Sequence, residues 1–380
     1  MKSTGARKVP PLFLLAFVPM LLAAWLAPER GGASTTAADP ITPKQIYMRA
    51  CASCHGVDGR GRSADAVGFD VELPDFTDCS FATREPDSDW GSVVHGGGPV
   101  RVFDRMMPAF GEAWSEEDGA SALAHVRSFC DETSWPRGEL NMPRAMLTEK
   151  AFPEDEAVIT SFVPLRGTPG ISNKFVYEQR VGARGQLEAI VPFGLKELDD
   201  GNWGAGLGDV AFGTKWAVLH STWSGSILSV AGEIILPTGN EAQGFGKGVP
   251  ILEPFISYGQ LLPWDSFLHM QLGGEVSTDP TRVGHEVFGR GALGTTFTQG
   301  RYGRAWSPMI EVLAARDFEL DAPIHWDVAP QLQVTLSKRQ HIMGAIGVRI
   351  PVTEFDERDT QVMVYLLWDW FDGSFTDGWW

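Results

Sequence analysis

The sequence of 380 residues contains few cysteines, few tyrosines and an excess of acidic over basic residues. Its four cysteines all lie within residues 51–130. None precedes residue 51, which excludes a lipid anchor on a leader cysteine. There are 31 Lys and Arg against 48 Asp and Glu, giving a formal charge of −17. Because such a chain repels phosphate backbones, we expect no nucleic acid partner.

Long apolar runs are confined to the N-terminus. Three basic residues precede an apolar run over residues 12–27, which is the pattern of a secretory signal peptide and is short for a membrane span. We therefore expect a signal peptide and short leader over residues 1–38, cleaved after Ala27 or near Ala38; an uncleaved anchor is the alternative. After residue 30 no window approaches the length of an apolar membrane span, so we expect no transmembrane helix there.

The segment Cys51-Ala52-Ser53-Cys54-His55 has the CxxCH spacing of c-type haem attachment. Two thiols on one helical turn can reach the two vinyl groups of a haem, and the adjacent imidazole can bind the iron. A CxxC redox pair or half of a zinc site would have the same spacing. A redox pair is expected in a βαβ context, and the chain has no second CxxC for zinc. We therefore expect one covalent haem c on Cys51 and Cys54, with His55 on the iron.

A second iron ligand is expected from Met106-Met107-Pro108. Proline disfavours helix at the preceding residue, so Met107 lies on an extended loop from which its thioether can reach iron. A thioether ligand raises the reduction potential into an electron-transfer range. Met106 is the second choice, and both methionines could instead be core residues. His95 and His125 are less favoured as ligands.

Helix signals surround this site. A helix is expected from Thr42 into the CxxCH, and a closing helix from Ser115, with its acidic first turn, to near Cys130. With an N-terminal helix, CxxCHG, a Met-Pro loop and a C-terminal helix, residues 41–131 resemble a class I cytochrome c. The resemblance implies a small, separate all-α mono-haem domain, which we place at residues 39–131.

The resemblance also implies His55 and Met107 as the axial ligands and the two CxxCH cysteines as thioether anchors. Cys79 and Cys130 are additional to the pattern of that family. In an oxidising compartment we expect these two cysteines to form a disulfide.

Residues 132–156 are Pro-rich and charged, and we interpret them as a linker in which a short helix over 144–150 is conceivable. From residue 157 the hydrophobic periodicity becomes two. Over residues 326–336, for example, even-numbered positions are apolar and odd-numbered positions are polar or small. We predict eleven such strands, and a twelfth near 158–165. The eleven lie near residues 173–183, 185–197, 209–220, 226–237, 250–262, 266–277, 285–299, 307–318, 325–338, 340–352 and 360–371.

A soluble β-sandwich and an outer-membrane β-barrel both fit this pattern. The long strands, the small and charged residues on the wet face, and the aromatic residues near strand ends favour the barrel. An even number of strands closes a barrel and removes its edges. The predicted fold is therefore an all-α cytochrome c domain followed by an antiparallel transmembrane barrel of about 12 strands over residues 157–380. The charged residues expected in the lumen are Glu188, Lys215, Glu233, Glu253, Arg290, Glu311 and Arg349.

Two resemblances concern function. Residues 206–210 (Gly-Leu-Gly-Asp-Val) and 236–239 (Leu-Pro-Thr-Gly) resemble an outer-membrane transporter family linked to the degradation of aromatic compounds, over roughly residues 170–371. The order of signal peptide, mono-haem segment and barrel resembles the fused cytochrome–porin proteins of extracellular electron transfer, whose best-known members oxidise ferrous iron. The predicted barrel is smaller than that usually proposed for those iron oxidases, so iron as substrate is only a hypothesis.

The second resemblance implies electron transfer in the outer membrane, between an extracellular donor or acceptor and a periplasmic carrier such as a soluble cytochrome or cupredoxin. The haem would be periplasmic or within the lumen, and membrane lipid would surround the barrel. The alternative is a solute pore whose periplasmic haem serves a separate redox partner. An enzyme is least favoured, because six-coordinate His/Met iron has no open position.

Overall fold

The computed structural model describes residues 41–70 and 72–370. The expected signal peptide, over residues 1–38, lies outside the described residues. Among the helices of the described residues, none is long and apolar enough to cross a membrane.

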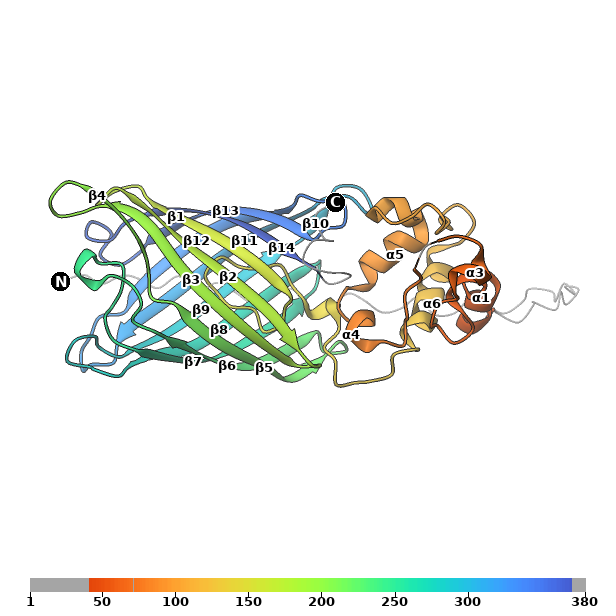
Figure 1. Ribbon diagram of the computed structural model, residues 1–380, viewed down its shortest axis with the longest axis horizontal. Helices are drawn as coiled ribbons and strands as arrows, with labels where there is room; N and C mark the ends of the chain where they lie inside the picture. Colours follow the sequence, from red (N-terminus) through yellow and green to blue (C-terminus); the bar gives the residue numbers. More distant parts are fainter. Residues whose placement is uncertain (1–40, 71, 371–380) are drawn as a thin grey trace, which may run out of the picture. The chain divides into compact units, whose positions relative to one another are not determined.

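The sheet is a closed antiparallel barrel (Figure 1). It has 14 strands, of which two are short: β4 pairs with β3, and β10 pairs with β11. The other twelve strands form the ring, which the pairing of β1 with β14 closes. The strands are β1 (Glu156–Pro164), β2 (Gly170–Val181), β3 (Gly185–Glu197), β4 (Trp203–Leu207), β5 (Ala211–Ser221), β6 (Ser226–Ile235), β7 (Ile251–Leu262), β8 (Ser266–Ser277), β9 (Glu286–Thr295), β10 (Phe297–Thr298), β11 (Ala305–Asp317), β12 (His325–Thr335), β13 (Ile342–Pro351) and β14 (Gln361–Asp369). The prediction of a barrel of about twelve strands is confirmed.

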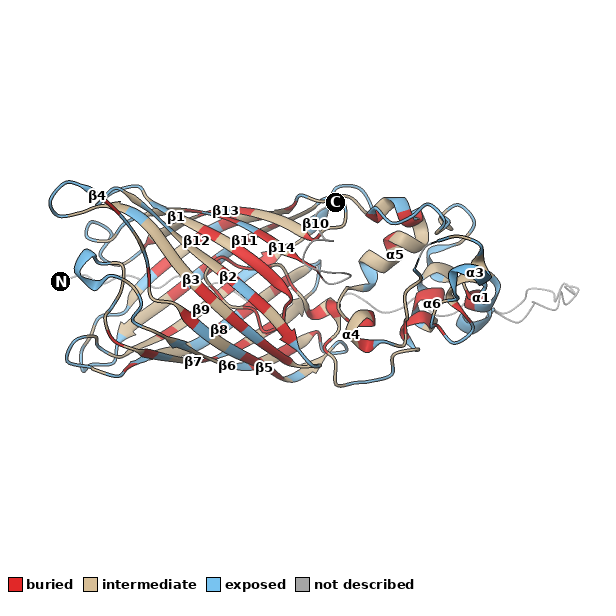
Figure 2. Ribbon diagram, viewed as in Figure 1, coloured by how far each residue is buried: buried red, intermediate tan, exposed pale blue. Residues whose placement is uncertain are grey.

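Along the strands, buried residues alternate with more exposed ones (Figure 2). Along β12, Trp326 is 41% exposed and Asp327 is 2% exposed. The apolar face therefore points outward and the polar face inward, as the period of two predicts. The expected lumen charges agree with this alternation, since Lys215 and Glu311 are buried and Arg290 is half-buried.

Short helices precede the barrel. They are α1 (Pro43–Ala50), α2 (Ala52–His55), α3 (Ala64–Val67), α4 (Cys79–Ala82), α5 (Asp87–Gly96), the 3₁₀ helix η1 (Gly98–Arg101) and α6 (Glu116–Arg127). Thr42 and Ser115 cap α1 and α6, each in a reciprocal capping box that satisfies otherwise unpaired backbone N–H groups. A small aromatic core joins the two helices, with the rings of Tyr47 and Phe129 5.2 Å apart.

The prediction of a separate all-α cytochrome c domain is wrong. The described helical residues and the barrel fall in one compact unit, and the helices before the barrel have only 4 to 12 residues. Ion pairs join the helices to the barrel: Arg84 Nη1 lies 2.5 Å from Asp155 Oδ2, and Arg301 Nη2 lies 2.9 Å from Glu116 Oε1. Arg101 also donates to the Tyr302 carbonyl at 2.9 Å. Local helix signals identify the helices but carry no information about such distant partners, which is why the sequence suggested independence.

Cys79 at the start of α4 and Cys130 just after α6 form a disulfide. Their Cα atoms are 5.3 Å apart, and the bond spans a sequence separation of 51 residues. The disulfide ties the middle of the helical segment to its last helix, which restricts the unfolded chain.

Residues 140–155, here called the lumen segment, are mostly buried and contact inward-facing residues of β11, β5 and β6, so they lie inside the barrel. The 3₁₀ helix η2 (Gly138–Leu140) leads into this segment, and residues 144–150 form no helix. Met142 and Phe152 belong to a buried apolar cluster with strand residues such as Ile227. The lumen is therefore filled by the chain's own backbone and side chains at this level.

Candidate functional site

One helical turn brings the CxxCH residues together. Cys51 ends α1, where its N–H donates to the Tyr47 carbonyl at 2.8 Å, and the Cys51 carbonyl accepts from the His55 N–H at 2.9 Å. Cys51 and Cys54 are both free thiols. Burial and the neighbouring Cys54 raise the pKa of Cys51 to about 11, so this thiol is protonated at neutral pH. Two thiols and an imidazole thus share a single turn.

His55 has the features of an available metal ligand. Its Nδ1 atom is shielded from solvent and has no hydrogen-bond partner among the described residues. Its ring stacks on Phe76 with centroids 5.0 Å apart. Burial lowers the pKa of His55, which favours the neutral imidazole that binds metals. This donor set fits a haem attached in the c-type manner.

The two methionine candidates lie on the loop after η1. The Met107 N–H donates to the Asp104 carbonyl at 3.2 Å, and the Met107 carbonyl accepts from the Gly98 N–H at 3.1 Å. The Met107 side chain is half-buried, whereas Met106 is 47% exposed. This difference agrees with the preference for Met107, whose axial role stays a prediction.

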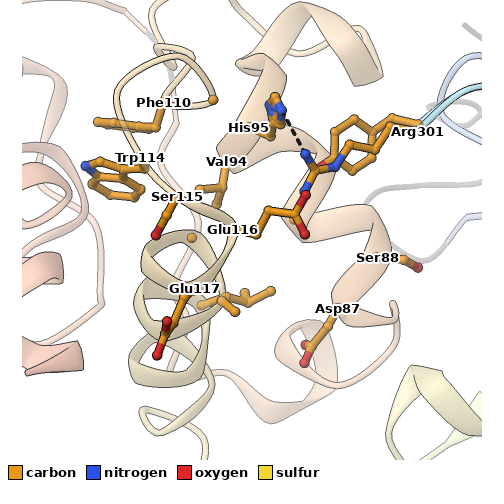
Figure 3. A pocket seen from close by; sticks show the side chains of 16 residues that line it. Asp87, Ser88, Val94, His95, Phe110, Trp114, Ser115, Glu116, Glu117 and Arg301 are labelled. Carbon is orange, nitrogen blue, oxygen red and sulfur yellow. Dashed lines mark hydrogen bonds and ion pairs between the residues drawn. The ribbon is translucent and has the colours of Figure 1, made fainter. Parts of the chain in front are cut away.

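The two other histidines have their own surroundings. His125 lies in the aromatic core, 5.0 Å from the Tyr47 ring. His95 lines a pocket of about 590 Å³ between α5, α6 and the turn that carries Arg301. Figure 3 shows His95 and Glu116 directed toward Arg301, whose Nη1 lies 3.4 Å from His95 Nε2. The pocket does not include the CxxCH residues, so it is separate from the expected haem site.

Glu311 on β11 is a main anchor of the lumen segment. Its carboxylate accepts from the backbone N–H groups of Met146 at 2.9 Å, Leu147 at 3.1 Å and Thr148 at 2.7 Å, and from the Thr148 hydroxyl at 2.6 Å. Hydrogen bonds from several donors strongly stabilise a buried carboxylate, and the same bonds fix the positions of the donor groups. This arrangement fixes residues 146–148 against the barrel wall.

Ion pairs hold the rest of the lumen segment. Arg144 Nη1 lies 2.7 Å from Glu178 Oε2 and also contacts Glu156. Lys215 Nζ lies 3.0 Å from Glu149 Oε1. Lumen charges from the wall and from the segment therefore neutralise one another.

A cavity of about 470 Å³ lies beside the lumen segment. Arg144 and Glu149 of the segment line it, together with wall residues that include Lys174, Glu188 and Glu233. The loops over residues 208–209 and 244–247 complete the lining, so the cavity extends toward the strand ends that carry the longer loops.

The two ends of the barrel differ. One end has the tight turns 182–184, 222–225 and 263–265, and the other has longer connections such as 236–250 and 352–360. The helical segment contacts the short-turn end, as the bond from Arg101 to the turn residue Tyr302 shows. In outer-membrane barrels the short turns face the periplasm.

Sequence reasoning did not place the lumen segment. Its proline, methionine and mixed charges are equally typical of a connector, and its partners Glu311 and Gln331 lie more than 160 residues away in the chain. Residues 144–152 mix apolar and charged side chains without a regular period, so the sequence does not distinguish a lumen from a surface here.

The barrel's exterior defines the class of this protein. A closed antiparallel barrel leaves no unpaired strand edge, and large apolar side chains cover its outer face. Examples are Phe212, Trp216, Leu252, Leu293 and Ile346, which are all exposed. Such a surface is stable in hydrocarbon, and the fold is that of a membrane-spanning barrel of the outer-membrane type.

Among the comparisons with known proteins, only the comparison with solved structures finds matches. No family model matches the chain. No curated protein matches it either. Among solved structures, an outer membrane channel from Pseudomonas putida F1 has a TM-score of 0.43 at 10% identity, covering 60% of this chain and 100% of that one. NanC porin has 0.40 at 6% identity, covering 56% and 99%, and KdgM porin 0.37 at 9% identity, covering 57% and 99%. At these values the likeness carries no conclusion about function.

Proposed function

We propose that this protein carries one covalent haem c and transfers electrons at the outer membrane, between periplasmic carriers and an extracellular donor or acceptor. The observation that carries the proposal is the turn holding Cys51, Cys54 and His55, with both thiols free and Nδ1 of His55 without a hydrogen-bond partner in the described part of the chain. We infer that the barrel lies in the outer membrane, with the helical segment at its periplasmic end.

Each residue of the site has a defined role in this proposal. The Cys51 and Cys54 thiols would attach the haem through thioether bonds, and His55 would bind the iron. Met107 would be the second axial ligand, with Met106 as the second choice. When bound, the haem supplies one-electron redox chemistry. Because both axial positions would be filled, electron transfer is favoured over turnover of a substrate on the iron.

The filled lumen supports this function over a simple open pore. The apolar band of such barrels is about 25 Å tall, which is a long distance for one electron transfer. The cavity beside the lumen segment would let a small extracellular donor or acceptor enter the lumen and approach the periplasmic side. A soluble cytochrome or cupredoxin would exchange electrons with the haem on that side.

A solute pore is the second candidate. The barrel itself and the cavity of about 470 Å³ are the observations that favour it. In that case the lumen segment, residues 140–155, would have to move to open a path, and the haem would serve a separate periplasmic partner.

Haem attachment tests the first step of the proposal. After expression with the c-type haem maturation machinery, the wild-type chain is expected to keep haem on a denaturing gel, seen by its peroxidase stain. C51A/C54A is expected to lose the stain completely, because both thioether bonds are lost. C79A/C130A is the matched control and should keep the stain, since its thiols are used in a disulfide. A wild-type chain without bound haem would refute the proposal.

A further inference from the structure

Residues 97–111, here called the methionine loop, fold back on the helix that precedes them. The loop follows the end of α5, runs through η1 and contains Met107. The Met107 carbonyl accepts from the Gly98 N–H at 3.1 Å, at the start of η1. The Phe110 N–H donates to the Val94 carbonyl of α5 at 3.0 Å. The position of Met107 therefore depends on the positions of η1 and α5.

Arg101, the last residue of η1, joins the methionine loop to two other parts of the molecule. It is only 6% exposed, although it carries a charge. Its Nη2 atom lies 3.1 Å from Asp89 Oδ1 on α5, and its Nη1 atom donates to the Tyr302 carbonyl at 2.9 Å. Tyr302 belongs to the barrel turn over residues 299–304, between β10 and β11. One buried guanidinium, with its donors in a rigid planar arrangement, thus fixes the loop to a helix and to the barrel.

The backbone beside Arg101 is strained. Val102 has a φ of 62°, in the left-handed region. A β-branched residue rarely adopts this conformation, which persists only where surrounding contacts impose it. The loop is also tightly closed, because a Cβ atom on Gly98 would overlap the Asp104 carbonyl oxygen. The bonds from Arg101 hold the residue next to the strained position, so they help to impose this one conformation of the loop.

The same barrel turn reaches the far end of the methionine loop through His95. The His95 ring lies over Gly111, since a Cβ atom on Gly111 would overlap this ring. The Tyr302 ring packs edge-on against His95, with centroids 5.2 Å apart. Figure 3 shows Arg301 beside His95 and Glu116, but the ion pair between Arg301 and Glu116 is exposed and contributes little. The aromatic contact and the buried guanidinium are therefore the main connections to the barrel.

We propose that Arg101 is a positioning residue for Met107, through which the barrel turn at Tyr302 holds the expected second axial ligand in place. This inference rests on the proposed function, because it concerns the ligand on the iron. A loosely held loop lets its thioether leave the iron, which opens one axial position and lowers the reduction potential. Because the loop is bound to the barrel, stable ligation by the thioether requires a folded barrel.

Hydrogen exchange tests the connection between loop and barrel without any haem. The full chain in detergent micelles is transferred to deuterium oxide, and uptake in residues 97–111 is followed by mass spectrometry. R101Q is expected to speed exchange in the loop roughly tenfold, because hydrogen bonds from a charged group are lost. R105Q is the matched control and should exchange as the wild type does. Arg105 is exposed on the same loop and forms no ion pair within the described part of the chain.

Carbon monoxide binding tests the effect on the iron ligand. Carbon monoxide binds ferrous haem only at an open axial position, so its binding to the reduced, haem-loaded chain measures how often Met107 leaves the iron. R101Q is expected to bind carbon monoxide roughly tenfold faster than the wild type and to keep the haem stain on a denaturing gel. R105Q should bind it at the wild-type rate, and M107A gives the rate for a chain that lacks this ligand.

Two more variants separate positioning from misfolding. R101Q leaves Asp89 without its cation, so D89N/R101Q removes both charges together and is expected to show the same two effects. Y302A changes the barrel turn alone and is expected to speed both exchange and carbon monoxide binding, because the ring contact with His95 is lost. Folding of the barrel in every variant is checked by the mobility shift of the unheated protein on a gel.

The outcomes distinguish this inference from the proposed function. Equal exchange in the wild type, R101Q and R105Q would overturn the inference, and so would faster exchange in R101Q without faster carbon monoxide binding. A wild-type chain without haem would refute the proposed function and, with it, the role of Met107. Faster exchange in R101Q would still show, in that case, that the barrel holds the methionine loop.

Discussion

Replacing Glu311 with alanine is expected to open the lumen to ions. The Glu311 carboxylate accepts three backbone hydrogen bonds and one hydroxyl from residues 146–148, and a Gln331 amide as well. Hydrogen bonds to a charged group contribute about 1.5–3 kcal/mol each, so even partial loss shifts the ratio of filled to open lumen by roughly 100-fold. The wild type should conduct poorly in a planar bilayer, and E311A should show frequent open-channel events.

The comparison needs a control for the loss of one negative charge. Glu357 is exposed on a loop between β13 and β14, so E357A should conduct as the wild type does. If the wild type already conducted as well as E311A, the lumen segment would not close the barrel, and the pore function would be favoured.

Replacing Met107 with alanine is expected to lower the reduction potential of the proposed haem. A thioether ligand stabilises ferrous iron, and its loss should move the potential down by on the order of 0.1–0.3 V, within the roughly 0.8 V over which axial ligands act. The sulfur-to-iron charge-transfer absorption of the oxidised protein should disappear as well. A spectroelectrochemical titration of the purified protein measures both effects.

Met106 is the matched control for this experiment, because it is the adjacent methionine and is more exposed. M106A should keep the potential and the charge-transfer absorption of the wild type. The opposite result, with both effects in M106A and neither in M107A, would reverse the ligand assignment. If M106A and M107A both kept the potential and the charge-transfer absorption of the wild type, the second ligand would be a different residue.

The barrel could be predicted from the sequence because its signal is local and repeated. Each strand crosses from one interface to the other, so apolar and polar side chains must alternate over its whole length. The expected strand over 325–338 is β12, at His325–Thr335, and the expected twelfth strand near 158–165 is β1, at Glu156–Pro164. Short β4 was missed because its five residues, Trp-Gly-Ala-Gly-Leu, are too few to show a period and two of them are glycine.

The placement of the helices and of the lumen segment could not be predicted in the same way. The caps at Thr42 and Ser115 are local and were found, but the bonds from Arg84 to Asp155 and from Glu116 to Arg301 join residues far apart in the chain. These contacts make the helical segment part of one unit with the barrel. A resemblance based on motifs alone suggested a separate domain because it included only local features.

Electron transfer across a sealed membrane tests the central claim most directly. The haem-loaded protein is reconstituted in liposomes that enclose a soluble redox dye, a membrane-impermeant reductant is added outside, and an H55A variant without the normal iron ligand serves as the comparison. We expect the wild type to reduce the dye, H55A to fail to reduce it, and neither protein to let the dye leak out. Passage of small solutes through both proteins, without haem-dependent reduction of the dye, would contradict electron transfer as the function and favour a pore.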